Sequence, residues 1–110
     1  MNSKKKTEFI EKINHFLEQL DKSIAKDDTL VKPEIQKAYK MINQPEKVSQ
    51  QYNQVHDAIA DMNIAFQNLA VSKKYHFSSE QNELINELKT LSRRSLKDSF
   101  IGVINGAVMH

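Results

Sequence analysis

The sequence predicts an all-α protein that folds as an antiparallel four-helix bundle, and three observations support this. Only two glycines and two prolines occur among 110 residues, so long elements with few tight turns are favoured. Good helix formers such as lysine, glutamate, glutamine, leucine and alanine dominate the composition. Apolar residues recur at steps of three and four, and no stretch alternates as a strand would. Four amphipathic segments with short connections pack as a bundle.

The first helix is predicted over residues 5–26. Its apolar stripe repeats at three- and four-residue steps and comprises Phe9, Ile13, Phe16, Leu17, Leu20 and Ile24. Asp27, Asp28 and Thr29 then interrupt the pattern. Their short polar side chains can cap the helix that follows.

A shorter second helix is predicted from residue 30 or 33 to residue 42. Pro33 suits the first turn, because the N–H that proline lacks would have no partner there. The apolar stripe comprises Ile35, Ala38, Tyr39 and Ile42. Pro45 marks the end of this helix and can open the next one, since residues before proline avoid the helical conformation.

The third helix, over residues 46–71, has the clearest pattern. Its apolar residues follow a heptad spacing of alternating four and three, and they are Val48, Tyr52, Val55, Ile59, Met62, Phe66 and Leu69. At 1.5 Å per residue this helix would be roughly 39 Å long. A stripe of that length needs partner helices of similar length.

The fourth helix is predicted to follow a capping box, with Ser78 as N-cap and Gln81 reaching back to it. Its buried stripe comprises Leu84, Ile85, Leu88 and Leu91. Acidic residues come early and basic residues late, which complements the helix dipole. We expect this helix to fray near residues 95–98. The prediction is thus one domain, with the bundle over residues 1–95 and a C-terminal tail over residues 96–110.

Little in the sequence indicates catalysis, so we predict no catalytic residue, no metal site and no cofactor. Cysteine is absent, which excludes a disulfide framework and a thiolate nucleophile. The four histidines lack metal-ligand spacing. His56 followed by Asp57 suggests a phospho-accepting histidine, but the residues after it do not fit that pattern. An enzyme would need a pocket with converging polar groups.

Charge and hydropathy limit the classes of partner. A net charge of +2 is too small to indicate nucleic acid by itself, and we expect none. No run of 18 apolar residues and no signal peptide occurs, so we expect no transmembrane segment and no secretion signal, and the absence of cysteine fits a reducing cytoplasm. Arg93, Arg94 and Lys97 form a basic cluster. It either compensates the helix dipole or forms the charged rim of a contact surface.

The tail contains an apolar segment, residues 100–110, in which seven of eleven residues are apolar. Three interpretations are open: it packs into the groove between the helices over 46–71 and 78–95, it docks to a partner, or it lacks fixed structure. We favour packing of most apolar side chains of the tail against the bundle, with the rest presented to a partner, because an apolar tail exposed to water promotes aggregation.

Residues 74–94 resemble the start of the last helix in the enterocin A immunity family, the immunity proteins against class IIa (pediocin-like) bacteriocins. The matching pattern is a basic residue, Phe, Ser or Thr, Gln three further on, then Leu-Ile and Leu. In this chain the positions are Lys74 or His76, Phe77, Ser78, Gln81, Leu84, Ile85 and Leu88. The overall layout is also similar: about a hundred residues, a lysine-rich start, a long third helix and a nonhelical tail. The apolar, glycine-spaced tail departs from the aromatic or charged tails of relatives.

The resemblance implies a non-enzymatic bacteriocin immunity protein inside the producer cell. Such proteins bind the bacteriocin-engaged mannose phosphotransferase permease from the cytoplasmic side and block the pore. We therefore expect a monomer in the cytoplasm, partly at the inner face of the membrane and able to associate with it peripherally. The C-terminal half decides specificity in the family, which implies partner-binding residues Arg93, Arg94, Lys97, Phe100, Ile101, Val103, Ile104 and Val108. The alternative is a generic helical adaptor or regulator that binds a soluble partner.

Overall fold

The structure, a computed structural model, describes residues 2–108, with side chains described up to residue 95. Within that part it contains four helices and no strand. The helices are α1 (Ser3–Ser23), α2 (Lys32–Asn43), α3 (Val48–Val71) and α4 (Ser79–Val108). The predicted all-α, four-helix fold is therefore confirmed.

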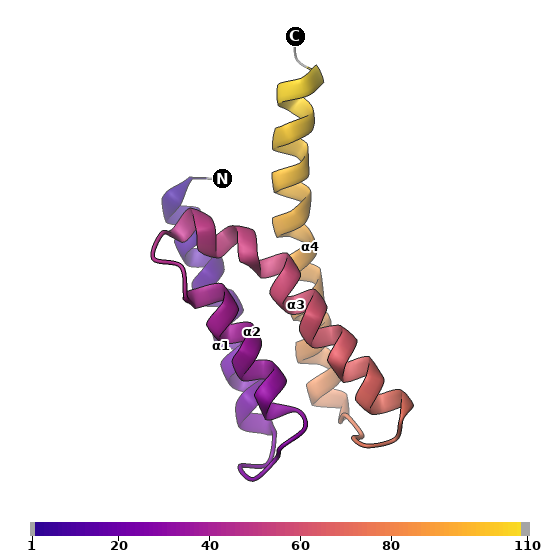
Figure 1. Cartoon of the computed structure of the whole chain (residues 1–110). Coiled ribbons are helices and arrows are strands. Elements are labelled where there is room, and N and C mark those ends of the chain that lie inside the picture. The colour runs from indigo at the N-terminus through magenta and orange to yellow at the C-terminus, as the bar shows by residue number, and fades with distance from the viewer. Residues whose placement is uncertain (1, 109–110) are drawn as a thin grey trace.

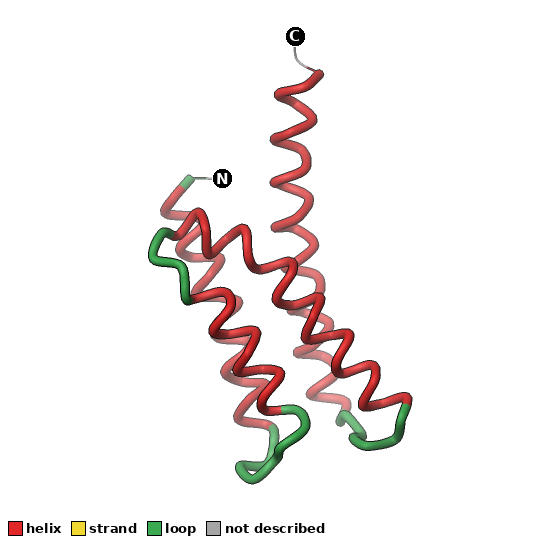
Figure 2. Tube along the Cα trace, in the orientation of Figure 1, coloured by secondary structure: helices red, strands yellow, loops and turns green. Residues whose placement is uncertain are grey.

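The four helices run alternately in opposite directions, and the loops lie at the two ends of the bundle (Figure 1 and Figure 2). α1 packs against each of the other three helices, and α3 packs against both of its neighbours in sequence. In the described part of the chain, α2 and α4 do not contact each other. These two helices therefore occupy opposite sides of the bundle, and α1 and α3 meet across its centre.

The core lies along the predicted stripes of the helices. In α3 the heptad prediction holds, because its central members are all buried: Tyr52, Val55, Ile59, Met62 and Phe66. Val48 and Leu69, at the two ends of the heptad, are partly buried against the same core. α1 contributes Phe9, Ile10, Ile13, Leu17 and Leu20, and α4 contributes Ile85, Leu88 and Leu91.

The prediction that Tyr39 belongs to the buried stripe of α2 is wrong. Its side chain is 46% exposed, whereas Ile35, Ala38 and Ile42 are buried. Tyr39 directly follows Ala38, so it is turned about 100° away from the face that those three residues share. It borders a groove between α1 and α2, beside Leu17. α1 also ends at Ser23, three residues before the expected end.

Asp28 organises the connection between α1 and α2. Its Oδ1 accepts hydrogen bonds from the backbone N–H groups of Leu30, Val31 and Lys32, at 3.0, 2.6 and 2.9 Å. Burial alone would raise the pKa of Asp28, but the three N–H donors and the nearby Lys32 charge outweigh it and lower the pKa below its usual value. The capping role predicted for this polar cluster is confirmed at Asp28.

Two polar contacts fix α1 against α2. Asn14 and Asn43 exchange hydrogen bonds, each Nδ2 donating to the other Oδ1 at 2.8 Å. Closer to the loop, Lys32 Nζ donates to the Asp21 carbonyl at 2.7 Å and lies 3.2 Å from Asp21 Oδ2. These side-chain pairs define the register of the two helices more narrowly than apolar packing does.

α3 ends in a Schellman motif built around a lysine. The Lys74 N–H bonds the Leu69 carbonyl at 2.9 Å, and the Lys73 N–H bonds the Ala70 carbonyl at 3.1 Å. Lys73 has φ of 61°, the left-handed conformation that glycine usually supplies at this position. It is the only non-glycine residue with positive φ among those described.

α4 does not fray near residues 95–98, as the sequence led us to expect, but remains helical to Val108. The reason is that no proline follows and the single glycines at 102 and 106 each cost only about 1 kcal/mol in a helix. Figure 1 shows the last turns of α4 extending beyond the other helices. The side chains of residues 96–110 lie outside the described part, but the backbone of α4 runs on past the other helices, which differs from the predicted packing of the tail into the groove between α3 and α4.

Candidate functional site

The start of α4 is a capping box, as the sequence predicts. The Gln81 N–H donates to Ser78 Oγ at 3.1 Å, and the Ser78 N–H donates to Gln81 Oε1 at 2.9 Å. Two N–H groups that the helix itself cannot satisfy are thus paired reciprocally. The box fixes the residue at which α4 begins.

Gln81 also ties α4 to the rest of the bundle, a role that the sequence did not indicate. Its side chain is 6% exposed, and Nε2 donates to the Ser23 carbonyl at 3.1 Å and to Tyr75 Oη at 3.3 Å. Tyr75 packs on Phe77, which packs on Phe66 of α3, with ring centroids 4.6 and 5.0 Å apart. One glutamine therefore joins the start of α4 to the end of α1.

A second buried contact holds α4 at the opposite end of the bundle. Ser95 Oγ donates to the Tyr52 carbonyl of α3 at 3.0 Å, and Ser95 is 2% exposed. The Tyr52 ring lies 5.2 Å from that of Phe9 in α1, and Lys6 Nζ lies 5.3 Å above it. The burial of Ser95 was not predicted from the sequence, because serine is polar and the buried stripe was built from apolar residues alone. Ser95 nevertheless follows Leu88 and Ser92 at helical spacing.

The structure places the predicted contact residues on one continuous helix. The side chains of Arg93 and Arg94 are exposed on α4. The remaining six, Lys97, Phe100, Ile101, Val103, Ile104 and Val108, lie on the helical backbone of α4, and their side chains lie outside the described part. Their contacts with one another and with the bundle therefore stay predictions.

The amphipathic pattern of α4 reverses where the helix leaves the bundle. Steps of three and four residues keep positions on one face of a helix. The buried face of Ile85, Leu88 and Ser95 continues through serine and glycine positions, namely 99, 102 and 106. The exposed face of Asn82, Asn86 and Arg93 continues through the apolar positions 100, 104 and 108. Leu96 and Val103 keep helical spacing with the buried Ser92 and Ile85, whereas Phe100, Ile104 and Val108 fall on the face that is polar in the bundle.

Basic residues concentrate at the end of the bundle from which α4 projects. We call residues 2–12, 44–55 and 89–98 the basic end, since they include nine lysines and arginines against four acidic residues. The opposite end, residues 18–34 and 62–83, includes five basic and seven acidic residues. The small net charge of the chain therefore hides a charge separation along its long axis.

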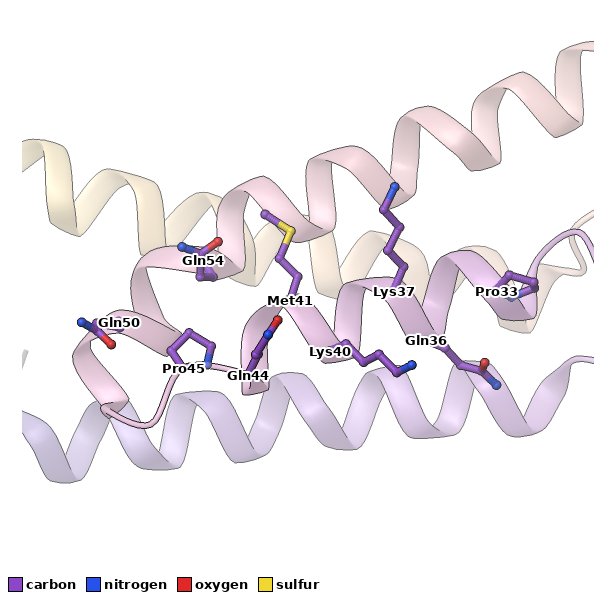
Figure 3. Close-up of a pocket in the computed structure, with 9 residues that line it drawn as sticks. All are labelled: Pro33, Gln36, Lys37, Lys40, Met41, Gln44, Pro45, Gln50 and Gln54. Atoms are coloured by element: carbon purple, nitrogen blue, oxygen red, sulfur yellow. The ribbon is translucent and has the colours of Figure 1, made fainter.

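A shallow groove of about 850 Å³ lies between α2 and the start of α3. Figure 3 shows Lys37 and Met41 extending from α2 toward α3, whereas Gln36 and Lys40 lie on the side of α1. The rest of its lining consists of Pro33, Gln44, Pro45, Gln50 and Gln54. Amides and lysines can hold a polar segment, and the lining of this groove includes no carboxylate and no histidine.

Three further features of the described residues concern metal binding, a phospho-accepting histidine and membrane crossing. Within the described residues, no three or more His, Cys, Asp and Glu side chains come together as they would around a metal ion. His56 Nδ1 lies 3.4 Å from Asp57 Oδ1 at a partly exposed position, where the contact is long and weak. In the described part of the chain, no helix has the combined length and apolar character needed to cross a membrane.

Comparisons of the chain with protein-family models, curated proteins and solved structures gave no match. The resemblance of residues 74–94 to the enterocin A immunity family is therefore neither supported nor contradicted by them. It stays a prediction that depends on the capping-box segment, the chain length and the order of the helices, whereas the nonhelical tail expected from the family differs from the helix that continues to Val108.

Proposed function

We propose that this chain is a bacteriocin immunity protein that protects its producer cell from a class IIa, pediocin-like bacteriocin. Its proposed partner is the mannose phosphotransferase permease with the bacteriocin engaged, approached from the cytoplasmic side. The observation that carries the proposal is the reversed amphipathic pattern of α4. Positions 100, 104 and 108 are apolar but do not continue the line of the buried face, which supports a contact with another molecule.

The proposed contact has the composition of a protein interface. Apolar positions from Phe100 to Val108 would form its centre, and the exposed Arg93 and Arg94 would form part of its charged rim. A helix that presents an apolar face can dock into a groove of a partner, with contacts at three- and four-residue steps. The capping box and the Ser95 contact serve this surface by holding the first part of α4 rigidly in the bundle.

The proposed mechanism is selective binding without chemistry. A protein that binds the closed pore of the bacteriocin-engaged permease more tightly than the open pore shifts the engaged permease toward the closed state. To convert a mixture of 1% closed and 99% open pores to the reverse ratio, the preference must be about 10⁴-fold. The interface must therefore include permease surface that differs between the closed and the open pore.

The test is survival of a sensitive bacterial strain that expresses this chain, across a panel of class IIa bacteriocins. We expect protection against one or a few of them. A chain that lacks residues 102–110 should keep most of its helicity and lose protection, because those residues lie beyond the Ser95 contact. Failure of the folded, abundant full chain against the whole panel would contradict the proposal and favour the adaptor alternative.

A matched pair of variants separates recognition from general loss of apolar surface. Phe100→Ser with Ile104→Ser changes two apolar positions of the proposed contact. Ile64→Ser with Val71→Ser changes two exposed apolar side chains on α3, which are 57% and 83% exposed. Only the first pair should reduce survival. Equal survival of the two variants would remove the end of α4 from the mechanism.

A further inference from the structure

We infer that the basic end and the projecting end of α4 together form a surface that docks onto an anionic lipid bilayer. This inference rests on the proposed function, because it concerns the same end of α4 and names the lipid surface that this end meets, but its test requires no bacteriocin and no permease. Two observations carry it. The basic residues collect at one end of the bundle, and an apolar helical segment projects from that same end.

The geometry brings the two features together. Ser95, the last residue of α4 whose side chain is described, bonds the Tyr52 carbonyl, and Lys6 of α1 lies over the Tyr52 ring. The first turns of α1 are thus held beside the point where α4 leaves the bundle. Lys4 and Lys5 are exposed there, as are Arg93 and Arg94 on α4 itself. Figure 1 shows the start of α1 and the end of α4 at the same end of the molecule.

The charge distribution fits an anionic surface better than it fits another copy of this chain. The basic end includes nine basic and four acidic residues, so two copies that met through it would repel each other. The attraction of basic residues to an anionic leaflet acts within about one Debye length, roughly 8–10 Å at physiological salt. Only basic residues at the end of the protein that faces the bilayer therefore contribute to this attraction.

The projecting segment has the length of an interfacial helix, and most of the basic residues lie beside it on the bundle instead of on its own polar face. Residues 96–108 span about 20 Å as a helix, shorter than the roughly 30 Å of hydrocarbon in a bilayer. Residues 99–110 include no acidic, lysine or arginine residue. A short helix with one apolar face and basic residues beside it inserts that face at the boundary of headgroups and acyl chains.

The chain offers a direct probe, because it contains no tryptophan. Ile104→Trp places a single fluorophore in the projecting segment, and Lys26→Trp places one at the opposite end. We expect vesicles of phosphatidylglycerol and phosphatidylcholine to shift the emission of the Ile104→Trp variant to shorter wavelength and to leave that of the Lys26→Trp variant unchanged. Vesicles of phosphatidylcholine alone should cause a much smaller shift, and raising the salt from about 0.1 to about 1 M should reverse most of it.

Two charge variants give the matched control. The first changes Lys4, Lys5, Arg93 and Arg94 to Gln, and the second changes Lys22, Lys26, Lys73 and Lys74 to Gln. All eight side chains are exposed, and both variants lose four positive charges. Vesicle flotation should show binding at least about tenfold weaker for the first variant and nearly unchanged for the second.

Three results would overturn the inference: no binding of the folded wild-type chain to anionic vesicles, equal weakening by the two charge variants, or unshifted emission of the Ile104→Trp variant when it is bound to vesicles. Self-association through the same end, seen by sedimentation without lipid, would also contradict it. Bacteriocin survival assays give an independent readout. Protection without lipid binding would refute this inference alone, and lipid binding without protection would refute the proposed function alone.

Discussion

Replacement of Lys73 by glycine should stabilise the protein, which is a sharp test of the chain reversal after α3. Lys73 is exposed and has φ of 61° within the Schellman motif. A residue with a Cβ atom loses about 1–2 kcal/mol in the left-handed conformation, and glycine avoids that cost. Glycine also gives the unfolded chain more freedom, which opposes the gain by about 0.4–1 kcal/mol. The net expectation is a stabilisation of about 0.5–1 kcal/mol.

The assay is thermal and urea unfolding followed by circular dichroism, with Lys74→Gly as the control. Lys74 is also exposed but has negative φ, so the same change there should destabilise by about 0.5–1 kcal/mol. In a domain of this size, Lys73→Gly should raise Tm by about 2–8 °C. If both variants lower Tm by similar amounts, the left-handed conformation of Lys73 does not strain the folded chain.

Three other predictions test the remaining contacts. Ser78→Ala should cost about 1 kcal/mol of unfolding free energy through loss of the N-cap, and an unchanged midpoint would contradict the capping box. Met62→Ala should cost about 2–5 kcal/mol as a core truncation, whereas Ile64→Ala at an exposed position of the same helix should cost less than about 1 kcal/mol. Because the pKa of Asp28 is lowered on folding, its contribution to stability is present above its unfolded pKa of about 4 and is lost as pH falls further. Asp28→Asn should weaken the dependence of the urea unfolding midpoint on pH between about pH 5 and 2. An unaltered pH dependence would exclude this carboxylate as a source of acid sensitivity.

Periodicity was sufficient to predict the helices and most of the core, because burial of one helix face imposes the 3.6-residue repeat directly on the sequence. It failed at Tyr39, where an apolar residue beside Ala38 lies just outside the buried face and borders a groove. The end of α4 was missed for a different reason. The reversal of its pattern after residue 95 resembles the end of a helix, although the backbone continues to Val108.

The polar contacts show a second limit of sequence reasoning. The capping box was predictable because its partners are three residues apart and the motif is local. The bonds of Gln81 to Ser23 and of Ser95 to Tyr52 join residues 58 and 43 positions apart. Such pairs depend on how the helices cross, which a single sequence does not reveal. The candidate site was therefore predicted as a set of residues, but its position relative to the basic end required the fold.

The two buried contacts of α4 have a geometric consequence. Gln81 and Ser95 are separated by fourteen positions along the helix, about 21 Å. Two attachment points that far apart define a line, so the axis of α4 is fixed in the frame of the bundle. The projecting residues continue along that axis without an intervening loop. A molecule that grips the end of α4 therefore also sets the direction in which the whole bundle points.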